Sequence, residues 1–201
     1  MTISAPPRVL IVGLGMIGAS FAKALRLSRA AYVLGMDAQP GVADRALELG
    51  IIDESVPAAE SVPAFDVLVL AVPVLAMESV LTALKPYLTD QTVISDVGSV
   101  KGQVVAAARQ ALGDDLPSGF VPGHPIAGAE RSGVEAAKAD LFDRHLLILT
   151  PLASSSSSAV ALLTELWQAV GAEVVTMSVS RHDEVLAATS HLPHLLAFSL
   201  V

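Results

Sequence analysis

Short apolar runs alternate with longer amphipathic segments along most of the chain. The short runs are typical of strands buried on both faces, and the longer segments have the period of helices with one apolar face. The predicted strands cover residues 9–12, 32–36, 67–72, 92–95, 146–149 and 174–177. The predicted helices cover residues 16–27, 42–49, 76–88, 100–112 and 159–170. This alternation predicts an α/β fold, in which helices cover both faces of a doubly wound, mainly parallel sheet.

The pattern changes near residue 180. The stretch RHDEVLAATSHLPHLLAFSLV is helical in pattern, and Pro193 forces a kink or a fresh start. We therefore expect one domain over residues 1–179 and the beginning of an α-helical domain over residues 180–201. Because this apolar helix has neither a polar stop nor a C-cap, we expect further chain or a second subunit to cover it. The sequence leaves two interpretations open, a piece of a longer protein or a short protein.

Composition narrows the classes of partner. The 201 residues carry a formal net charge of −8 with 12 Lys and Arg, which argues against nucleic acid, because clustered cations hold phosphate backbones. The sequence has no cysteine, which excludes disulfides, thiolate catalysis and Cys-ligated metals. No run reaches the roughly 18 unbroken apolar residues of a membrane span. We expect a cytoplasmic protein that binds a small molecule, and neither nucleic acid nor membrane.

Three glycines follow the first predicted strand and open the first predicted helix. Gly13, Gly15 and Gly18 in VLIVGLGMIGAS have the G-x-G-x-x-G spacing. In that context the first makes a tight turn, the second lets the backbone approach a pyrophosphate, and the third lets the helix pack on the strand. The helix N-terminus adds amides and a positive dipole end. The motif alone also fits an ordinary tight turn.

Asp37 strengthens the interpretation of these glycines as a Rossmann-type dinucleotide site. It ends the second predicted strand about 20 residues after the last glycine, where a carboxylate accepts hydrogen bonds from ribose hydroxyls. Its charge would repel a 2′-phosphate, and no Arg follows at 38 or 39, which favours NAD over NADP. Cofactor contacts are expected from Gly13, Gly15, Met16, Ile17, Gly18, Asp37, Val72 and Pro73.

Two further polar motifs follow later strands. DVGSVKG contains Asp96, Ser99 and Lys101, and GHPIAG contains His124. Because loops at the carboxyl ends of parallel strands surround the ligand, we expect both motifs to border one crevice. Each residue also has a purely structural interpretation: Ser99 as the N-cap of a helix from Val100, and His124 as a satisfied core histidine.

The segments GLGMIGAS, DVGSVKG, GHPIAGAERSG and SRHDEVLAATSHLPHLLA resemble the motifs of the prephenate and arogenate dehydrogenase family of tyrosine biosynthesis, in the same order and at similar spacings. The resemblance implies a dinucleotide-binding domain followed by a helical domain that forms a homodimer. It also implies NAD-dependent oxidative decarboxylation of prephenate to 4-hydroxyphenylpyruvate, or of arogenate to tyrosine. In this reaction hydride leaves the ring carbon that bears the 4-hydroxyl, and loss of the ring carboxylate produces the aromatic ring.

The same resemblance implies roles for individual residues. His124 would accept the proton of the 4-hydroxyl, which suits a neutral imidazole near pH 7. Ser99 would hydrogen-bond the same hydroxyl or the histidine. Glu130 fits a gate for substrate entry, a group that discriminates the amino group of arogenate from the keto group of prephenate, or a solvated surface acid. The substrate-binding residues implied by the family are Glu130, Arg131, Asp183, His191 and His194.

The sequence also allows two other functions. An NAD-binding regulatory module or a truncated remnant would keep Ser99 and His124 without turnover. A β-hydroxyacid dehydrogenase would need a lysine in its second domain, and the sequence offers none after Lys138. Family members also continue beyond the SHLPH motif, with a segment that supplies an arginine to the substrate carboxylate, and this places the activity of residues 1–201 alone in question.

The pair His191 and His194 resembles half of a zinc site. Pro193 disturbs the helix between them, and neither a cysteine nor an obvious third ligand completes the set. We therefore expect no metal.

Overall fold

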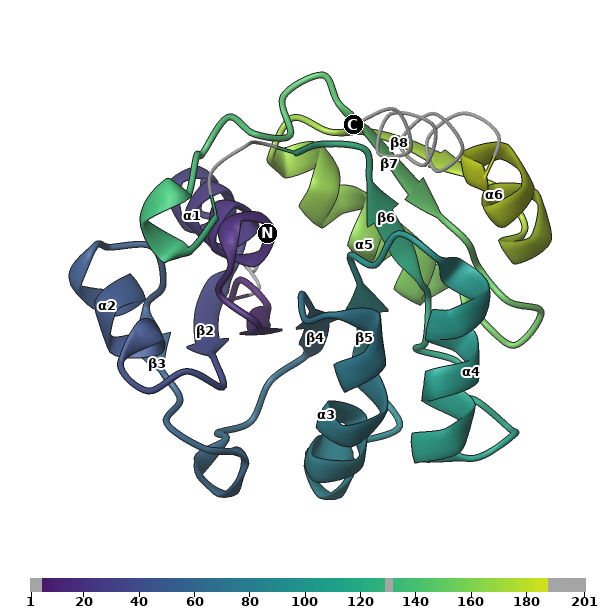
Figure 1. The fold of residues 1–201 in the computed structure, drawn as a ribbon, viewed down its shortest axis with the longest axis horizontal. Coiled ribbons are helices and arrows are strands. Elements are labelled where there is room, and N and C mark those ends of the chain that lie inside the picture. The colour runs from purple at the N-terminus through teal and green to yellow at the C-terminus, as the bar shows by residue number, and fades with distance from the viewer. Residues whose placement is uncertain (1–4, 129–131, 188–201) are drawn as a thin grey trace, which may run out of the picture.

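Five parallel strands form the main sheet of the protein, whose computed structural model describes residues 5–128 and 132–187 (Figure 1). The strands are β1 (Arg8–Val12), β2 (Tyr32–Met36), β3 (Glu54–Ser55), β4 (Val67–Leu70) and β5 (Val93–Asp96). Their order across the sheet is β3-β2-β1-β4-β5. The order reverses between β1 and β4, which is the point at which open sheets of this kind bind ligands at the carboxyl ends of their strands.

Helices cover both faces of this sheet. The α-helices are α1 (Met16–Ser28), α2 (Val42–Glu48), α3 (Met77–Leu84), α4 (Lys101–Leu112), α5 (Ser157–Ala169) and α6 (Val179–Leu186). The short 3-10 helices are η1 (Ala59–Ser61), η2 (Val74–Ala76), η3 (Lys85–Tyr87) and η4 (Val134–Ala136). Val9 and Ile11 of β1 pack with α1, α2 and α5, whereas Leu10 and Val12 pack with α3 and α4. Because successive side chains point to opposite faces, the strand is buried on both and its sequence is apolar throughout.

A smaller sheet continues the structure beyond β5. Its strands are β6 (Gly123–Pro125), β7 (Leu146–Leu149) and β8 (Glu173–Thr176). β6 runs antiparallel to β7, and β7 runs parallel to β8. An isolated bridge between Ile94 of β5 and Phe120 joins the two sheets, with the Ile94 amide donating to the Gly119 carbonyl at 2.9 Å. The start of β6 therefore lies beside the carboxyl end of β5.

This architecture confirms the predicted α/β fold with a doubly wound, mainly parallel sheet. Two strands, β3 and β6, are not predicted by the pattern of apolar residues. β3 has two residues, too few for a periodic signal. β6 is wrongly predicted as loop because it ends in Pro125 and follows Pro122, and proline is depleted in strands. His124 thus lies on a short strand instead of a strand-end loop.

The last described helix, α6, packs against α4 at the right of Figure 1. His182 and Leu186, four residues apart on one face of α6, are both buried. The predicted domain boundary at residues 179 and 180 coincides with the start of this helix and stays a prediction. Within residues 5–128 and 132–187, no helix has both the length and the apolar character needed to cross a membrane.

Candidate active site

The first glycine and the third glycine of the loop after β1 are required by close packing. Gly13 has a φ of 94°, and its amide donates to the Met36 carbonyl at 2.8 Å. A Cβ on Gly13 would lie 2.4 Å from the carbonyl oxygen of Ala71, and a Cβ on Gly18 would lie 2.0 Å from the carbonyl oxygen of Gly13. A side chain at either position would displace backbone. The turn and the entry of α1 therefore depend on glycine.

Gly15 differs from the other two because nothing lies within 4 Å of the position that its Cβ would take. It is the N-cap residue of α1, has no side-chain cap, and the first turn of the 13-residue helix carries no acidic residue. Met16 and Ile17 are the first residues of that helix. Amides at an uncapped helix N-terminus beside open space fit a phosphate group. The residues present thus fit the pyrophosphate of a dinucleotide.

Asp37 directly follows β2 and fixes the glycine loop. Its Oδ2 accepts a hydrogen bond from the Leu14 amide at 2.7 Å, and its Oδ1 accepts one from the Gln39 amide at 2.8 Å. Val72 lies against the same turn, since a Cβ on Gly13 would come 3.0 Å from Val72 Cγ1. The adjacent Pro73 is the N-cap residue of η2. The predicted cofactor residues of β1, β2 and β4 therefore meet at one end of the sheet.

A buried ion pair lies under the second motif. The side chains of Asp96 and Lys101 are fully buried, and Lys101 Nζ donates to Asp96 Oδ2 and to the carbonyl oxygen of Gly123. Asp96 also accepts from the amides of Gly98, at 2.7 Å, and Gly123, at 3.1 Å. Burial lowers the pKa of Lys101 below its ordinary value, and the Asp96 carboxylate opposes that effect. Both backbone polar groups of the residue before His124 are thus bound to this pair.

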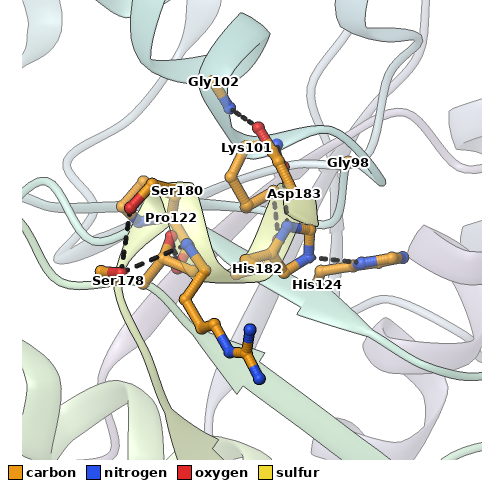
Figure 2. A network of polar contacts seen from close by, with 12 residues as sticks. Gly98, Lys101, Gly102, Pro122, His124, Ser178, Ser180, His182 and Asp183 are labelled. Atoms are coloured by element: carbon orange, nitrogen blue, oxygen red, sulfur yellow. Dashed lines mark hydrogen bonds and ion pairs between the residues drawn. The ribbon is translucent and has the colours of Figure 1, made fainter. Parts of the chain in front are cut away.

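His124 is hydrogen-bonded to a second histidine, His182, which no sequence motif singles out. Its Nδ1 lies 2.9 Å from Nε2 of His182, with the two ring planes at 61°. His182 is fully buried, and its Nδ1 lies 2.8 Å from Oδ1 of Asp183. Figure 2 shows the resulting chain of side chains from His124 on β6 to Asp183 on α6. His182 was missed because a single histidine in an amphipathic helix carries no spacing motif.

Asp183 is the last member of this hydrogen-bonded series and binds the first turn of α4. Its Oδ1 accepts from the Lys101 amide and its Oδ2 from the Gly102 amide, each at 2.8 Å. The carboxylate therefore caps the helix N-terminus from another helix. Partial burial acts to raise the pKa of Asp183, but the hydrogen bonds that the carboxylate accepts outweigh burial and hold the pKa below its ordinary value.

The interpretation of Ser99 as the N-cap of α4 is wrong. The N-cap residue is Val100, which makes no side-chain cap, and Asp183 supplies the acceptor instead. Ser99 is exposed in the bend between β5 and α4. Its predicted contact with substrate stays a prediction.

Four predicted substrate-binding residues lie outside the described residues. They are Glu130, Arg131, His191 and His194. In the part of the chain that the structure describes, no three His, Asp or Glu side chains form a group that could hold a metal ion.

Residues 21–176 match the family described as "Prephenate dehydrogenase, nucleotide-binding domain". The chain belongs to the prephenate dehydrogenase family. The match covers β2 to β8 and includes the Asp96–Lys101 pair and His124. It ends before α6, so His182 and Asp183 fall outside it.

Individual members of the family agree with this assignment. A cyclohexadienyl dehydrogenase from Zymomonas mobilis is 39% identical over 196 residues, which is 96% of this chain and 66% of the relative. The crystal structure of prephenate dehydrogenase from A. aeolicus in complex with hydroxyphenyl propionate and NAD+ superposes with a TM-score of 0.90 at 38% identity, covering all of this chain (100%) and 69% of that one. Synechocystis arogenate dehydrogenase has a TM-score of 0.86 at 30% identity, covering 96% and 67%. This chain thus spans about two thirds of the length of each of these relatives.

Proposed function

We propose that the protein catalyses the NAD-dependent oxidative decarboxylation of prephenate to 4-hydroxyphenylpyruvate, or of arogenate to tyrosine. The observation that carries the proposal is the position of His124. The protein belongs to the prephenate dehydrogenase family. Its His124 is on β6, next to the carboxyl end of β5, at the edge where sheets of this kind bind ligands. The family's members of known structure include one crystallised with NAD+ and hydroxyphenyl propionate.

His124 is the proposed general base. It takes the proton of the substrate 4-hydroxyl while the ring carbon is oxidised to a ketone, and it returns that proton to the phenolate oxygen after carbon dioxide has left. An imidazole suits both transfers, because its ordinary pKa lies near neutrality. Ser99, in the bend before α4, is proposed to hydrogen-bond the same hydroxyl. The reaction needs no metal, since the electrons of the broken carbon–carboxylate bond enter a ring that becomes aromatic.

NAD, when bound, accepts the hydride from the ring carbon. The residues proposed to hold it are the loop from Gly13 to Gly18, Asp37, Val72 and Pro73. Asp37 already accepts two backbone amides, and its oxygens keep lone pairs for ribose hydroxyls. Its negative charge is the reason to prefer NAD over NADP.

The remaining parts of the proposal concern residues beyond the described site. The residues proposed to bind the substrate are Asp183, Glu130, Arg131, His191 and His194. The helical region after residue 179 is proposed to form a homodimer in the cytoplasm. The resemblance to the family supports these points.

The test is His124→Asn in the complete protein. Asparagine keeps hydrogen-bonding capacity but cannot accept a proton, so we expect kcat with prephenate to fall by about two to four orders of magnitude. The dissociation constant of NAD should change less than about twofold, because His124 lies on β6, outside the glycine loop. The rate of NADH formation and an NAD titration measure the two quantities.

The choice of substrate is tested in the same assay with arogenate in place of prephenate. Near-normal turnover of His124→Asn would remove His124 from the role of base. An unmodified protein that binds NAD and oxidises neither substrate would support the regulatory module instead.

A further inference from the structure

Three side chains from two places in the sequence determine which nitrogen of His124 can act as a base. His124 is on β6, while His182 and Asp183 are adjacent on α6. The two hydrogen bonds that join them, of 2.9 Å and 2.8 Å, use Nδ1 of His124, both nitrogens of His182, and Oδ1 of Asp183. The rings meet edge on, and Figure 2 shows the second nitrogen of His124 on the side away from His182.

The direction of each hydrogen bond follows from the carboxylate of Asp183, the last group in the series. An ionised carboxylate only accepts, so Nδ1 of His182 donates to Asp183. A neutral His182 then has no proton on Nε2, which must accept. Nδ1 of His124 must therefore donate, and its own proton is placed on Nδ1. Nε2 of His124 is left as the unprotonated nitrogen, which is the form that a general base requires.

Asp183 is held in the position in which it accepts the hydrogen bond from Nδ1 of His182. Amides from the first turn of α4 donate to both of its oxygens at 2.8 Å. These bonds keep the carboxylate ionised and leave it no freedom to rotate away from His182. His182 is fully buried, and both of its ring nitrogens already have hydrogen-bond partners.

We infer that His182 and Asp183 are positioning residues that fix the tautomer of His124 with the proton on Nδ1, so that Nε2 faces the substrate as the base. This rests on the proposed function in one respect, the identity of the proton that Nε2 accepts. A carboxylate that orients a catalytic histidine directly is familiar from serine proteases. Here a second, buried histidine transmits the orientation, and each of the two rings carries its proton on Nδ1.

Asp183 both orients His182 and caps α4, and two variants of the complete protein test the first role. His182→Phe keeps a ring of similar size on the buried face of α6 and leaves Asp183 capping α4, but removes the acceptor for His124. Asp183→Asn keeps the size of the side chain but removes the charge that orients His182 and one of the two acceptors that cap α4. We expect either change to lower kcat by about 10- to 1000-fold, which is less than the loss on removing the base itself, because His124 is still present but misdirected. The dissociation constant of NAD should stay near its original value.

The decisive readout is the tautomer itself, measured by ring-nitrogen NMR without substrate. His124→Asn identifies the His124 signals. In the unmodified protein Nδ1 of His124 should carry the proton, and in His182→Phe the proton should move partly or wholly to Nε2. His145→Phe is the matched control, because His145 is an exposed histidine whose Nδ1 contacts only the Asp143 carbonyl among the described residues. It should change neither kcat nor the His124 signals.

Three results would overturn the inference. One is a proton on Nε2 of His124 in the unmodified protein at neutral pH. Another is a charged His182 that donates from both nitrogens. The third is a tautomer of His124 that is the same in His182→Phe, in a protein that is folded and binds NAD. If instead the tautomer is as expected and neither prephenate nor arogenate is oxidised, the proposed function fails and the positioning role stands.

Discussion

The two ends of the site are built in different ways. At the nucleotide end, backbone atoms define the shape. Gly13 and Gly18 allow close contacts, and the Asp37 carboxylate accepts a hydrogen bond from the amide of Leu14, 23 residues earlier in the sequence. At the histidine end, side chains define it, and the hydrogen bonds join residues 58 and 82 positions apart. A backbone-built site leaves a compact motif in the sequence. A site built from distant side chains leaves single residues whose partners cannot be seen until the chain has folded.

The largest expected effect is at the buried ion pair that supports the histidine end. Lys101→Met should lower the free energy of unfolding by about 3–5 kcal/mol, because it leaves the Asp96 carboxylate buried without its cation. Urea denaturation of the complete protein measures this. Lys85→Met is the matched control, since Lys85 donates to the Ala111 carbonyl without an ion pair, and it should cost no more than about 1 kcal/mol. Equal losses in the two variants would contradict the prediction.

At the nucleotide end, two glycines of one motif should respond differently. Gly18→Ala should lower the free energy of unfolding by about 1–3 kcal/mol, since its Cβ would displace the Gly13 carbonyl. Gly15→Ala should change it by no more than about 0.5 kcal/mol, because φ is −66° and the space in front is open. Gly15→Ala should instead weaken NAD binding. Urea denaturation and NAD titration test the contrast, which fails if Gly15→Ala binds NAD as tightly as the unmodified protein.

The smallest expected effect concerns cofactor choice. Asp37→Ser removes the charge that repels a 2′-phosphate and should narrow the preference for NAD over NADP by about tenfold. Titrating both nucleotides gives the ratio of dissociation constants. Asp66→Ser serves as the control, because Asp66 accepts the Arg8 amide at the amino end of β1 and should leave the ratio unchanged. An unmodified protein that binds NADP as tightly as NAD would show that Asp37 does not set the preference.

The sequence was sufficient for most of the fold and for the nucleotide end. Apolar runs flanked by glycine and proline predicted every strand of four or more residues, and the glycine spacing with Asp37 predicted where β1, β2 and α1 meet. These signals are local, because buried strands and tight turns restrict the residues that form them. β3 and β6 were missed because a strand of two or three residues is defined by its neighbours and not by its own sequence.

The histidine end could be predicted only in part. GHPIAG singled out His124, and the resemblance to the family added Asp183, but neither pointed to His182. One signal was available: His182 and Leu186 share a face of α6, and a histidine on an apolar face needs a partner. The pattern could not say which partner, because the answer depends on how α6 packs against α4. The same packing explains why Asp183, and not Ser99, caps that helix.

The distances along the chain between hydrogen-bonded residues of the two ends also set an order of assembly. Closing a contact across 58 or 82 residues costs more chain entropy than closing one across 23, and on a growing chain it must wait until the later residue has been synthesised. The glycine turn and Asp37 can therefore meet while most of the protein is still unmade. His124 acquires its orienting partner only after Asp183 has left the ribosome and α6 has docked. The orientation of His124 is thus set later in folding than the contact between Asp37 and the glycine turn.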